Sequence, residues 1–198
     1  MSRWDERYAE PGWAYGTEPN DFLRAVAPRL PRGRTLCLAD GEGRNGVHLA
    51  TLGHDVTAMD LSAIGLAKAE RLAAERGVRI TTVVADLAEF RIEPAAWDAI
   101  VSIFVHQPGA VRGPLHRAVV SGLRPGGAFA LEAYAPRQVE FGTGGPDDPD
   151  RLPPLETLIA ELEGLDWEIA REVERDVIEG RCHTGRGAVA QMLGWRRT

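Results

Sequence analysis

Short apolar runs alternate with helical patterns along the chain from Arg34 onward. Residues 63–77 have the apolar spacing of a helix, with Ser62 before them as an N-cap and Gly77 where a C-cap glycine belongs. This alternation is typical of βαβ units, so we predict an α/β fold with a mainly parallel sheet. The core strands are expected at residues 35–39, 55–59, 79–85, 97–105 and 127–134.

The two ends of the chain add further elements. Two helical pieces, RWDERYAE and EPNDFLRAVAPRL, precede the first strand and are separated by the aromatic connector PGWAYGT. After Tyr134 a segment rich in Gly, Pro and Asp extends to residue 154, and a loop of that length is usually a lid, a binding loop or disordered. A helix near 155–162 and strand-like runs at 167–180 and 185–195 predict a terminal antiparallel hairpin.

The length sets the number of domains. With 198 residues the chain can bury one core, and it is too short for two ordinary enzyme domains. We therefore predict a single domain over 1–198. It comprises an N-terminal helical lid (1–33), a cofactor-binding core (34–135) and a segment of long loop, helix and hairpin (136–198).

Composition and charge exclude several classes of function. The net charge of -6 argues against a nucleic-acid partner, because binding to phosphates draws on excess Lys and Arg. No apolar run reaches the roughly 20 residues that cross a bilayer, and the first residues lack a signal peptide's apolar segment, so we expect a cytoplasmic protein without membrane contact. Cys37 and Cys182 lack metal-ligand spacing, and we predict neither a disulfide nor a metal site.

A glycine-rich loop follows the first strand. Gly41, Gly43 and Gly46 form a G-x-G-x-x-G match that opens a helix. Glycine lets the backbone approach the sugar or phosphates of a nucleotide, and the match fits either NAD or an adenosyl group. The loop alone therefore predicts a nucleotide without choosing between them.

Carboxylates at the ends of the next two strands narrow the choice. Asp60 ends the second strand and can accept hydrogen bonds from both ribose hydroxyls, a placement that serves NAD and S-adenosylmethionine equally. Asp86 ends the third, and a carboxylate followed by the apolar Leu87 suits an adenine amine with its ring against the leucine. Since no second domain remains to supply a hydride acceptor site, S-adenosylmethionine is favoured over NAD.

Five segments, LCLADGEGRN, VTAMD, VVADLAEF, IVSIF and LRPGGAFALE, stand in an order and spacing that resemble the class I S-adenosylmethionine-dependent methyltransferases. The resemblance implies a three-layer Rossmann-like sandwich, with a seven-stranded, mostly parallel sheet of order 3-2-1-4-5-7-6 in which strand 7 is antiparallel. It implies S-adenosyl-L-methionine as cofactor, bound by Ala39, Asp40, Gly41, Gly43, Arg44, Asn45, Asp60, Leu61, Asp86, Leu87 and Ile103.

The chain departs from the family pattern at two positions. Cys37 stands where the family has an acid, and Ala39 where it has a first glycine. A neutral thiol cannot supply the charge that helps to hold the methionine ammonium, so that role passes to Asp40, Glu42 or backbone carbonyls. The following helix begins near Arg44, and the free N–H groups of its first turn are expected to face the methionine carboxylate. Arg44 itself either adds a charge there or is a surface arginine at the start of a helix.

Three residues are candidates for catalysis. His106 follows the fourth strand, where the methyl group should lie, and acts either as a base or as a loop histidine that shapes the pocket. His183 lies at the tip of the terminal hairpin, at the same edge of the sheet or else in solvent. Tyr15 either closes the methyl pocket or anchors the N-terminal segment.

The acceptor is predicted from similarity and from absences. The GEGRN loop, the short length and YGTEPNDFL are similar to small bacterial tellurite-resistance and thiol-type methyltransferases. No Asn/Asp-Pro-Pro-aromatic tetrad for base methylation follows the fourth strand. We predict methyl transfer by a monomer or weak homodimer to a small soft or anionic acceptor, such as a thiol or a selenium or tellurium species. The alternatives are a small-metabolite O- or N-methyltransferase and a non-catalytic S-adenosylmethionine-binding regulator.

Overall fold

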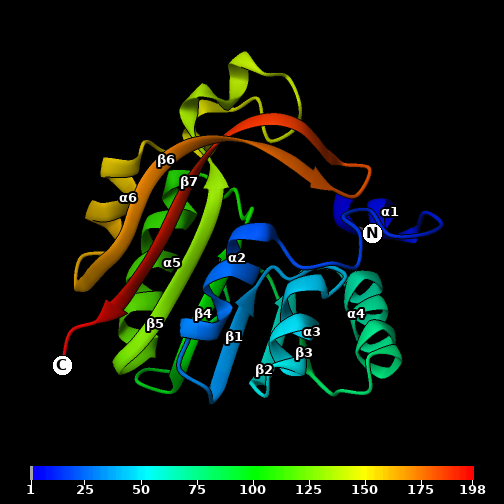
Figure 1. Ribbon diagram of the computed structural model, residues 1–198, viewed down its shortest axis with the longest axis horizontal. Coiled ribbons are helices and arrows are strands. Elements are labelled where there is room, and N and C mark those ends of the chain that lie inside the picture. Colours follow the sequence, from blue (N-terminus) through cyan, green and yellow to red (C-terminus); the bar gives the residue numbers. More distant parts are fainter. Residues whose placement is uncertain (1) are drawn as a thin grey trace.

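One seven-stranded sheet runs through the computed structural model, which describes residues 2–198 (Figure 1). Its order is β3-β2-β1-β4-β5-β7-β6, with β1 to β5 parallel and β7 antiparallel to both β5 and β6. The predicted fold class and strand order are confirmed. The strands are β1 (Arg34–Leu38), β2 (Asp55–Asp60), β3 (Thr81–Val84), β4 (Trp97–Ile103), β5 (Leu123–Tyr134), β6 (Leu165–Glu179) and β7 (His183–Arg196).

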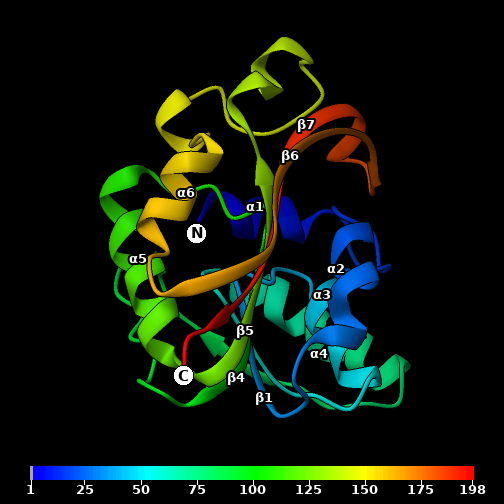
Figure 2. The same ribbon diagram turned by 60° about the vertical axis from the view of Figure 1, so that its left-hand side comes forward.

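Helices cover both faces of the sheet, which gives the three predicted layers (Figure 2). The side chains of β1 alternate between the two faces, because successive residues of a strand point in opposite directions. Leu36 and Leu38 pack in the core cluster that includes residues of α5 (Gly109–Gly122) and α6 (Leu155–Glu161). Cys37 packs in the opposite cluster, with residues of α2 (Asp21–Val26) and α3 (Arg44–Thr51), and α4 (Ala63–Glu75) packs beside α3.

Local sequence signals set several boundaries. The Ser62 side chain accepts a hydrogen bond from the Gly65 N–H at 3.1 Å and so caps α4, as predicted. Past the end of α4, Gly77 has a φ of +70°, which favours glycine. The LRPGG segment lies inside β5 as an irregularity, because four residues of β5 (124–127) lie between the pairs Trp97–Leu123 and Ala99–Ala128, where β4 has only Asp98.

The two helices of the N-terminal segment pack in different places, α1 (Arg3–Ala9) against α4 and α2 against the sheet. A capping box between Ser2 and Asp5 starts α1. The Ser62 hydroxyl, at the start of α4, donates to Asp5 at 2.6 Å. In contrast, α2 buries Leu23 and its neighbours against the sheet. Of the predicted lid at 1–33, α1 and the connector therefore border the functional cavity described below, whereas α2 belongs to the core.

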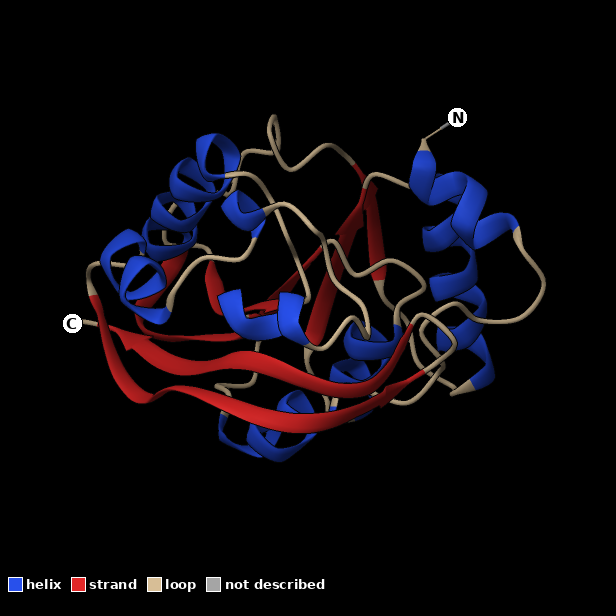
Figure 3. Ribbon diagram, turned by 90° about the horizontal axis from the view of Figure 1, so that it is seen from above, coloured by secondary structure: helices blue, strands red, loops and turns tan. Residues whose placement is uncertain are grey.

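The terminal hairpin is long and curved, and its tip returns toward α1 (Figures 1 and 3). Strands β6 and β7 pair from Leu165 and Arg196 up to Glu179 and His183. The loop after β5 contains the short 3-10 helices η2 (Pro136–Glu140) and η3 (Pro149–Arg151). Among residues 2–198, none of the helices has the length and apolar character needed to cross a membrane.

The assignment of α2 to the core predicts the cost of truncating its central side chain. Leu23 is fully buried, so Leu23→Ala should lower the free energy of unfolding by about 2–5 kcal/mol, through lost burial and the cavity left behind. Urea unfolding measures this. The control Val139→Ala, at a residue that is 57% exposed, should change it by less than about 0.5 kcal/mol. Equal effects of the two changes would contradict the packing of α2.

Candidate active site at the carboxyl ends of the strands

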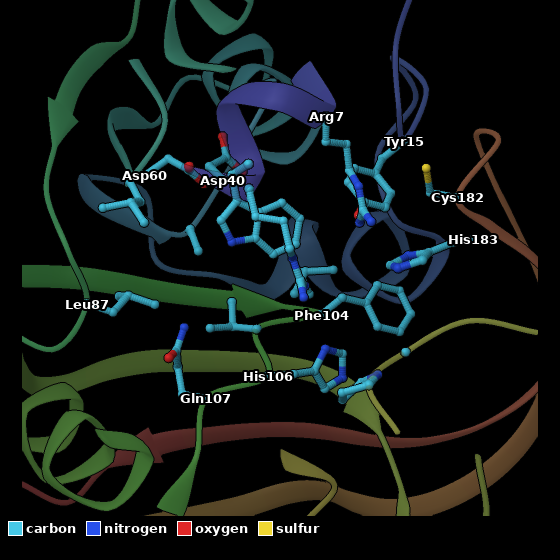
Figure 4. Close-up of a pocket in the computed structure, with 18 of the residues that line it drawn as sticks. Arg7, Tyr15, Asp40, Asp60, Leu87, Phe104, His106, Gln107, Cys182 and His183 are labelled. Atoms are coloured by element: carbon cyan, nitrogen blue, oxygen red, sulfur yellow. The ribbon is translucent and has the colours of Figure 1, made fainter. Parts of the chain in front are cut away.

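A cavity of about 980 Å³ opens at the carboxyl ends of β1, β2 and β4 (Figure 4). Ligands bind at this edge of open α/β sheets, where the strand order reverses. Residues from α1, the connector, the loop at 144–148 and the hairpin tip close its other sides. The predicted site residues that line it are Tyr15, Ala39, Asp40, Arg44, Asn45, Asp60, Leu61, Asp86, Leu87, Ile103, His106 and His183.

The glycine loop borders this cavity through Ala39, Asp40 and Glu42, whereas the predicted contacts Gly41 and Gly43 do not line it. Gly41 and Gly43 have φ values of +57° and +85°, and a Cβ on Gly41 would lie 2.5 Å from the hydroxyl oxygen of Tyr8. Ala39 also has a positive φ, +46°, although it carries a side chain. That conformation costs a non-glycine residue about 1–2 kcal/mol, which explains why a glycine suits this position.

Asp60 and Asp86 both line the cavity. Asp60 is buried, and its carboxylate accepts hydrogen bonds from the Gly41 N–H at 2.9 Å and the Ser62 N–H at 2.8 Å. Burial raises the pKa of Asp60 above its ordinary value. Asp86 accepts from the Ala88 N–H at 2.8 Å. The two carboxylates have lone pairs left over, which hydroxyl or amine donors of a ligand can use.

The structure gives different surroundings to the thiol and the two acids at which the chain departs from the family pattern or compensates for it. Cys37 lies among the helices on one face of the sheet and does not line the cavity. Glu42 is engaged, because its oxygens accept from the Ala14 N–H at 2.8 Å and from Lys68 Nζ at 2.8 Å. Asp40 accepts from the Gly46 N–H at 3.1 Å, and burial raises its pKa to about 7. Asp40 is thus the carboxylate in this loop without a cationic side-chain partner among residues 2–198.

Arg44 belongs to a buried ionic cluster beside the cavity. Its Nη2 pairs with Glu179, at the end of β6, and both side chains are buried. Arg175 pairs with Glu179 and with Glu132 of β5, and the Asn20 side chain donates to Glu132 at 2.7 Å and to Glu179 at 2.8 Å. Burial acts to raise the pKa of Glu179, but the Arg44 and Arg175 guanidiniums outweigh it and hold that pKa below its ordinary value.

The rings of Phe104, His106, Tyr134 and His183 form an aromatic wall at the end of the cavity beyond β4. Phe104, which follows β4 with a φ of +55°, has its ring 4.6 Å from that of His183 and 4.7 Å from that of Tyr134. His106 stacks on Tyr134, and its Nε2 accepts a hydrogen bond from the Tyr134 N–H at 3.0 Å. Burial lowers the pKa of His106 to about 3, so the ring is neutral at pH 7.

His183 lies on the other side of Phe104 from His106, and its ring contacts that of Tyr15 (Figure 4). Their rings are 4.6 Å apart, and the Tyr15 hydroxyl oxygen accepts from Arg7 Nη1 at 2.6 Å. Burial, and then the nearby charge of Arg44, lower the pKa of His183 to about 4. The Nδ1 atom of His183 is buried and finds no hydrogen-bond partner within residues 2–198.

Several cavity residues escaped sequence reasoning. Arg7 lies on a helix whose sequence is that of an ordinary surface helix. Phe104 has a positive φ, which its sequence does not predict. Arg151 donates to the His106 carbonyl at 3.0 Å from the end of η3. Only the loop at 144–148 had a sequence feature that indicated a place at the site, namely its richness in Gly, Pro and Asp. The remaining unpredicted lining residues include Trp4, Tyr8, Gln107 and Cys182.

The described part of the chain, 2–198, contains no group of three or more His, Cys, Asp or Glu side chains arranged to hold a metal ion. The cavity offers a ligand carboxylates, guanidiniums and backbone N–H groups.

Comparisons with known proteins agree with this geometry. The model of the methyltransferase domain family matches residues 36–127. No curated protein sequence matches the chain. A solved protein that converts a disulfide bond into a thioacetal group during echinomycin biosynthesis is similar over 96% of this chain and 85% of its own, with 22% identity and a TM-score of 0.75.

Two further solved structures show the same fold. TehB from Haemophilus influenzae is 19% identical with a TM-score of 0.74, and the match covers 90% of this chain and 62% of that one. An S-adenosylmethionine-dependent methyltransferase from Mesorhizobium loti is 22% identical with a TM-score of 0.68, over 88% of this chain and 95% of that one.

Residues 36–127 match the methyltransferase domain family, and the chain has the fold of solved S-adenosylmethionine-dependent methyltransferases. The protein is thus a methyltransferase, and its cofactor is S-adenosyl-L-methionine. The cavity fits that cofactor on one specific point. Arg44 lines the cavity and its Nη1 is buried without a partner among residues 2–198, so a carboxylate would satisfy a donor that the protein leaves open.

Removing the charge of Asp60 should weaken cofactor binding. If Asp60 accepts from the ribose hydroxyls, Asp60→Asn should weaken the binding of S-adenosylhomocysteine about 10-fold or more, because hydrogen bonds to a charged group contribute about 1.5–3 kcal/mol. Titration calorimetry measures this. Asp55→Asn, at the exposed opposite end of β2, is the matched control and should leave the affinity unchanged. Unchanged affinity in Asp60→Asn would remove Asp60 from the ribose site.

The buried Asp40 should make the stability of the ligand-free protein depend on pH. Its native pKa of about 7 exceeds its ordinary value of 3.8, so the native state binds the extra proton between these values. The free energy of unfolding should therefore fall as the pH rises from 4 to 7. Asp40→Asn should raise that free energy at pH 8 by about 1 kcal/mol or more, and the gain should vanish below pH 4. Urea unfolding at each pH tests this, and a gain independent of pH would contradict it.

Proposed function

We propose that this methyltransferase acts on a small soft or anionic acceptor, such as a thiol or a selenium or tellurium species, by in-line displacement at the cofactor's methyl group. The observation that supports this most is the state of the two imidazoles at the aromatic wall. His106 has its Nε2 occupied, and the pKa values of His106 and His183, about 3 and about 4, make both weak bases at pH 7. An acceptor that is already ionised needs no base.

In this proposal the cofactor lies along the ends of β1, β2 and β4. Asp60 accepts from the ribose, and Asp86 and Leu87 face the adenine, with Leu61 and Ile103 beside it. The amino-acid tail extends toward the start of α3. There the free N–H groups of the first helical turn, which Gly43 opens, suit a carboxylate. The bound cofactor supplies an electrophilic methyl group on a sulfonium, and the chain's own residues align the acceptor and exclude water.

The remaining predicted contacts belong to the same tail. Ala39 and Gly41 shape the loop beneath it, and Asn45 is held by the Asn20 N–H, which donates to its side-chain oxygen at 3.0 Å. Asp40 is placed to receive the methionine ammonium, because Glu42 is bound to Lys68 and Cys37 faces the helices.

Two guanidiniums border the acceptor end and can bind an anion, with the carboxylates of Asp147 and Asp148 beside them. Arg7 and Arg151 border this part of the cavity, and Arg7 donates to the Tyr15 oxygen, which leaves the Tyr15 hydroxyl proton free for an acceptor. Asp148 offsets part of the charge of Arg151, at 3.3 Å. The solved protein of echinomycin biosynthesis converts a disulfide bond into a thioacetal group, which adds support for a sulfur-type acceptor.

One observation favours the alternative of a small-metabolite O- or N-methyltransferase. The Nδ1 atom of His183 is buried and unpartnered at the cavity, so this ring could take a proton from a hydroxyl. Its low pKa makes it inefficient in that role at neutral pH. The soft-acceptor proposal therefore stands first.

A panel of acceptors tests the proposal, scored by release of S-adenosylhomocysteine. It contains a thiol, selenite, tellurite, a catechol and a primary amine. We expect release with the soft acceptors, at a rate that rises with pH as the thiol ionises. Release with the catechol or the amine alone would overturn the proposal, and no release with any acceptor would favour a non-catalytic binding protein.

Replacing the histidines separates an ionised acceptor from base catalysis. With a thiol, His106→Gln should change kcat/KM by less than about 3-fold, because glutamine can also accept from the Tyr134 N–H and no proton has to be removed. The same limit should hold for His183→Gln. A loss of about 100-fold in either variant, with the pH dependence of the rate flattened, would establish general-base catalysis instead.

A further inference from the structure

The buried ion pairs connect the cofactor loop to the terminal hairpin. Arg44 begins α3, directly after the glycine loop, and Glu179 is the last residue of β6. Their side chains are 8% and 4% exposed, and Arg175 and Asn20 complete the hydrogen bonds of Glu179. Because Glu179 takes one edge of the guanidinium, the orientation of Arg44 depends on it.

Arg44 keeps one donor unused. Its Nη1 is buried and has no partner among residues 2–198, and the residue lines the cavity. A buried charged donor without a partner costs free energy, so this position favours an anion. The partial positive charge at the start of α3 acts in the same direction.

Glu179 also adjoins the turn that closes the acceptor end. The N–H groups of Arg181 and Cys182 donate to the Ala14 carbonyl, at 3.1 Å and 3.3 Å, and Cys182 and His183 line the cavity beside Tyr15 (Figure 4). The hairpin tip is thus attached on one side to the connector and on the other, through Glu179, to Arg44.

We propose that Glu179 is a positioning residue. It holds the Arg44 guanidinium so that Nη1 binds the carboxylate of the cofactor, and the bound carboxylate in turn secures the hairpin tip that carries Cys182 and His183. The inference rests on the proposed location of the cofactor's amino-acid tail. It implies that the acceptor end is completed after the cofactor binds, which orders the binding of the two substrates.

Two ligands that differ in the amino-acid tail test the first part. S-adenosylhomocysteine carries the carboxylate, and 5′-methylthioadenosine lacks the whole tail. Glu179→Gln removes the charge with little change of shape, and Glu174→Gln, at a more exposed pair on the same strand, is the matched control. Calorimetry should show about 10-fold weaker binding of S-adenosylhomocysteine in Glu179→Gln, and less than about 2-fold change for 5′-methylthioadenosine or in the control.

Decarboxylated S-adenosylmethionine then identifies the group that is bound. It keeps the ammonium, so its affinity should also be insensitive to Glu179→Gln. Arg44→Gln should show the same selective loss, and the double variant should be no weaker than Arg44→Gln alone, because both changes remove one interaction. Equal losses for all three ligands, or no loss for any, would overturn the proposal.

Hydrogen exchange tests the second part and does not depend on turnover. S-adenosylhomocysteine should slow exchange of the Arg181 and Cys182 amides in the unaltered protein, whereas 5′-methylthioadenosine should not, and Glu179→Gln should abolish the difference. Protection by both ligands alike would contradict a role for the carboxylate. Failure of the unaltered protein to bind S-adenosylhomocysteine at all would refute the cofactor site itself, which is a different result.

Discussion

The buried pair between Arg44 and Glu179 fixes how the terminal hairpin meets the cofactor loop. Buried ion pairs add little net stability, because the cost of removing two charges from water offsets their attraction, yet leaving one partner alone is expensive. We therefore interpret the cluster of Glu132, Arg175, Glu179 and Arg44 as specifying how β6 is placed against β5 and the start of α3, more than as adding stability. Removing Glu179 from this place would leave the buried Arg44 without its carboxylate partner.

A second connection acts on the same parts from the opposite side. The Ala14 N–H donates to Glu42 in the glycine loop, and the Ala14 carbonyl accepts from the hairpin tip at Cys182. One connector residue thus holds together the cofactor loop and the segment that closes the acceptor end. The cavity walls come from three distant parts of the chain, and these contacts place them in register.

Sequence patterns predict the strand order, and they place Asp60 and Asp86 at the edge of the sheet where the cavity lies, since both depend on local signals. Strand and helix periodicity gives the order of elements, and the ends of parallel strands converge, so Asp60 and Asp86 can be placed without coordinates. The strand at 165–179 shows the limit of this reasoning. Its charged residues look like a solvent-facing edge, and only the fold shows that Arg175 and Glu179 find buried partners. Arg7 and Phe104 are hidden for the same reason: they reach the cavity through tertiary packing.

The distribution of charge connects the fold to the chemistry. Burial removes the charge from the histidines of the aromatic wall, and the cations that remain at the cavity are guanidiniums, which stay protonated at any physiological pH. In the proposed function, such a site attracts and aligns a nucleophile that arrives with its charge already formed. Alignment and exclusion of water then supply most of the catalysis, and the pH range of the reaction follows the pKa of the proposed acceptor.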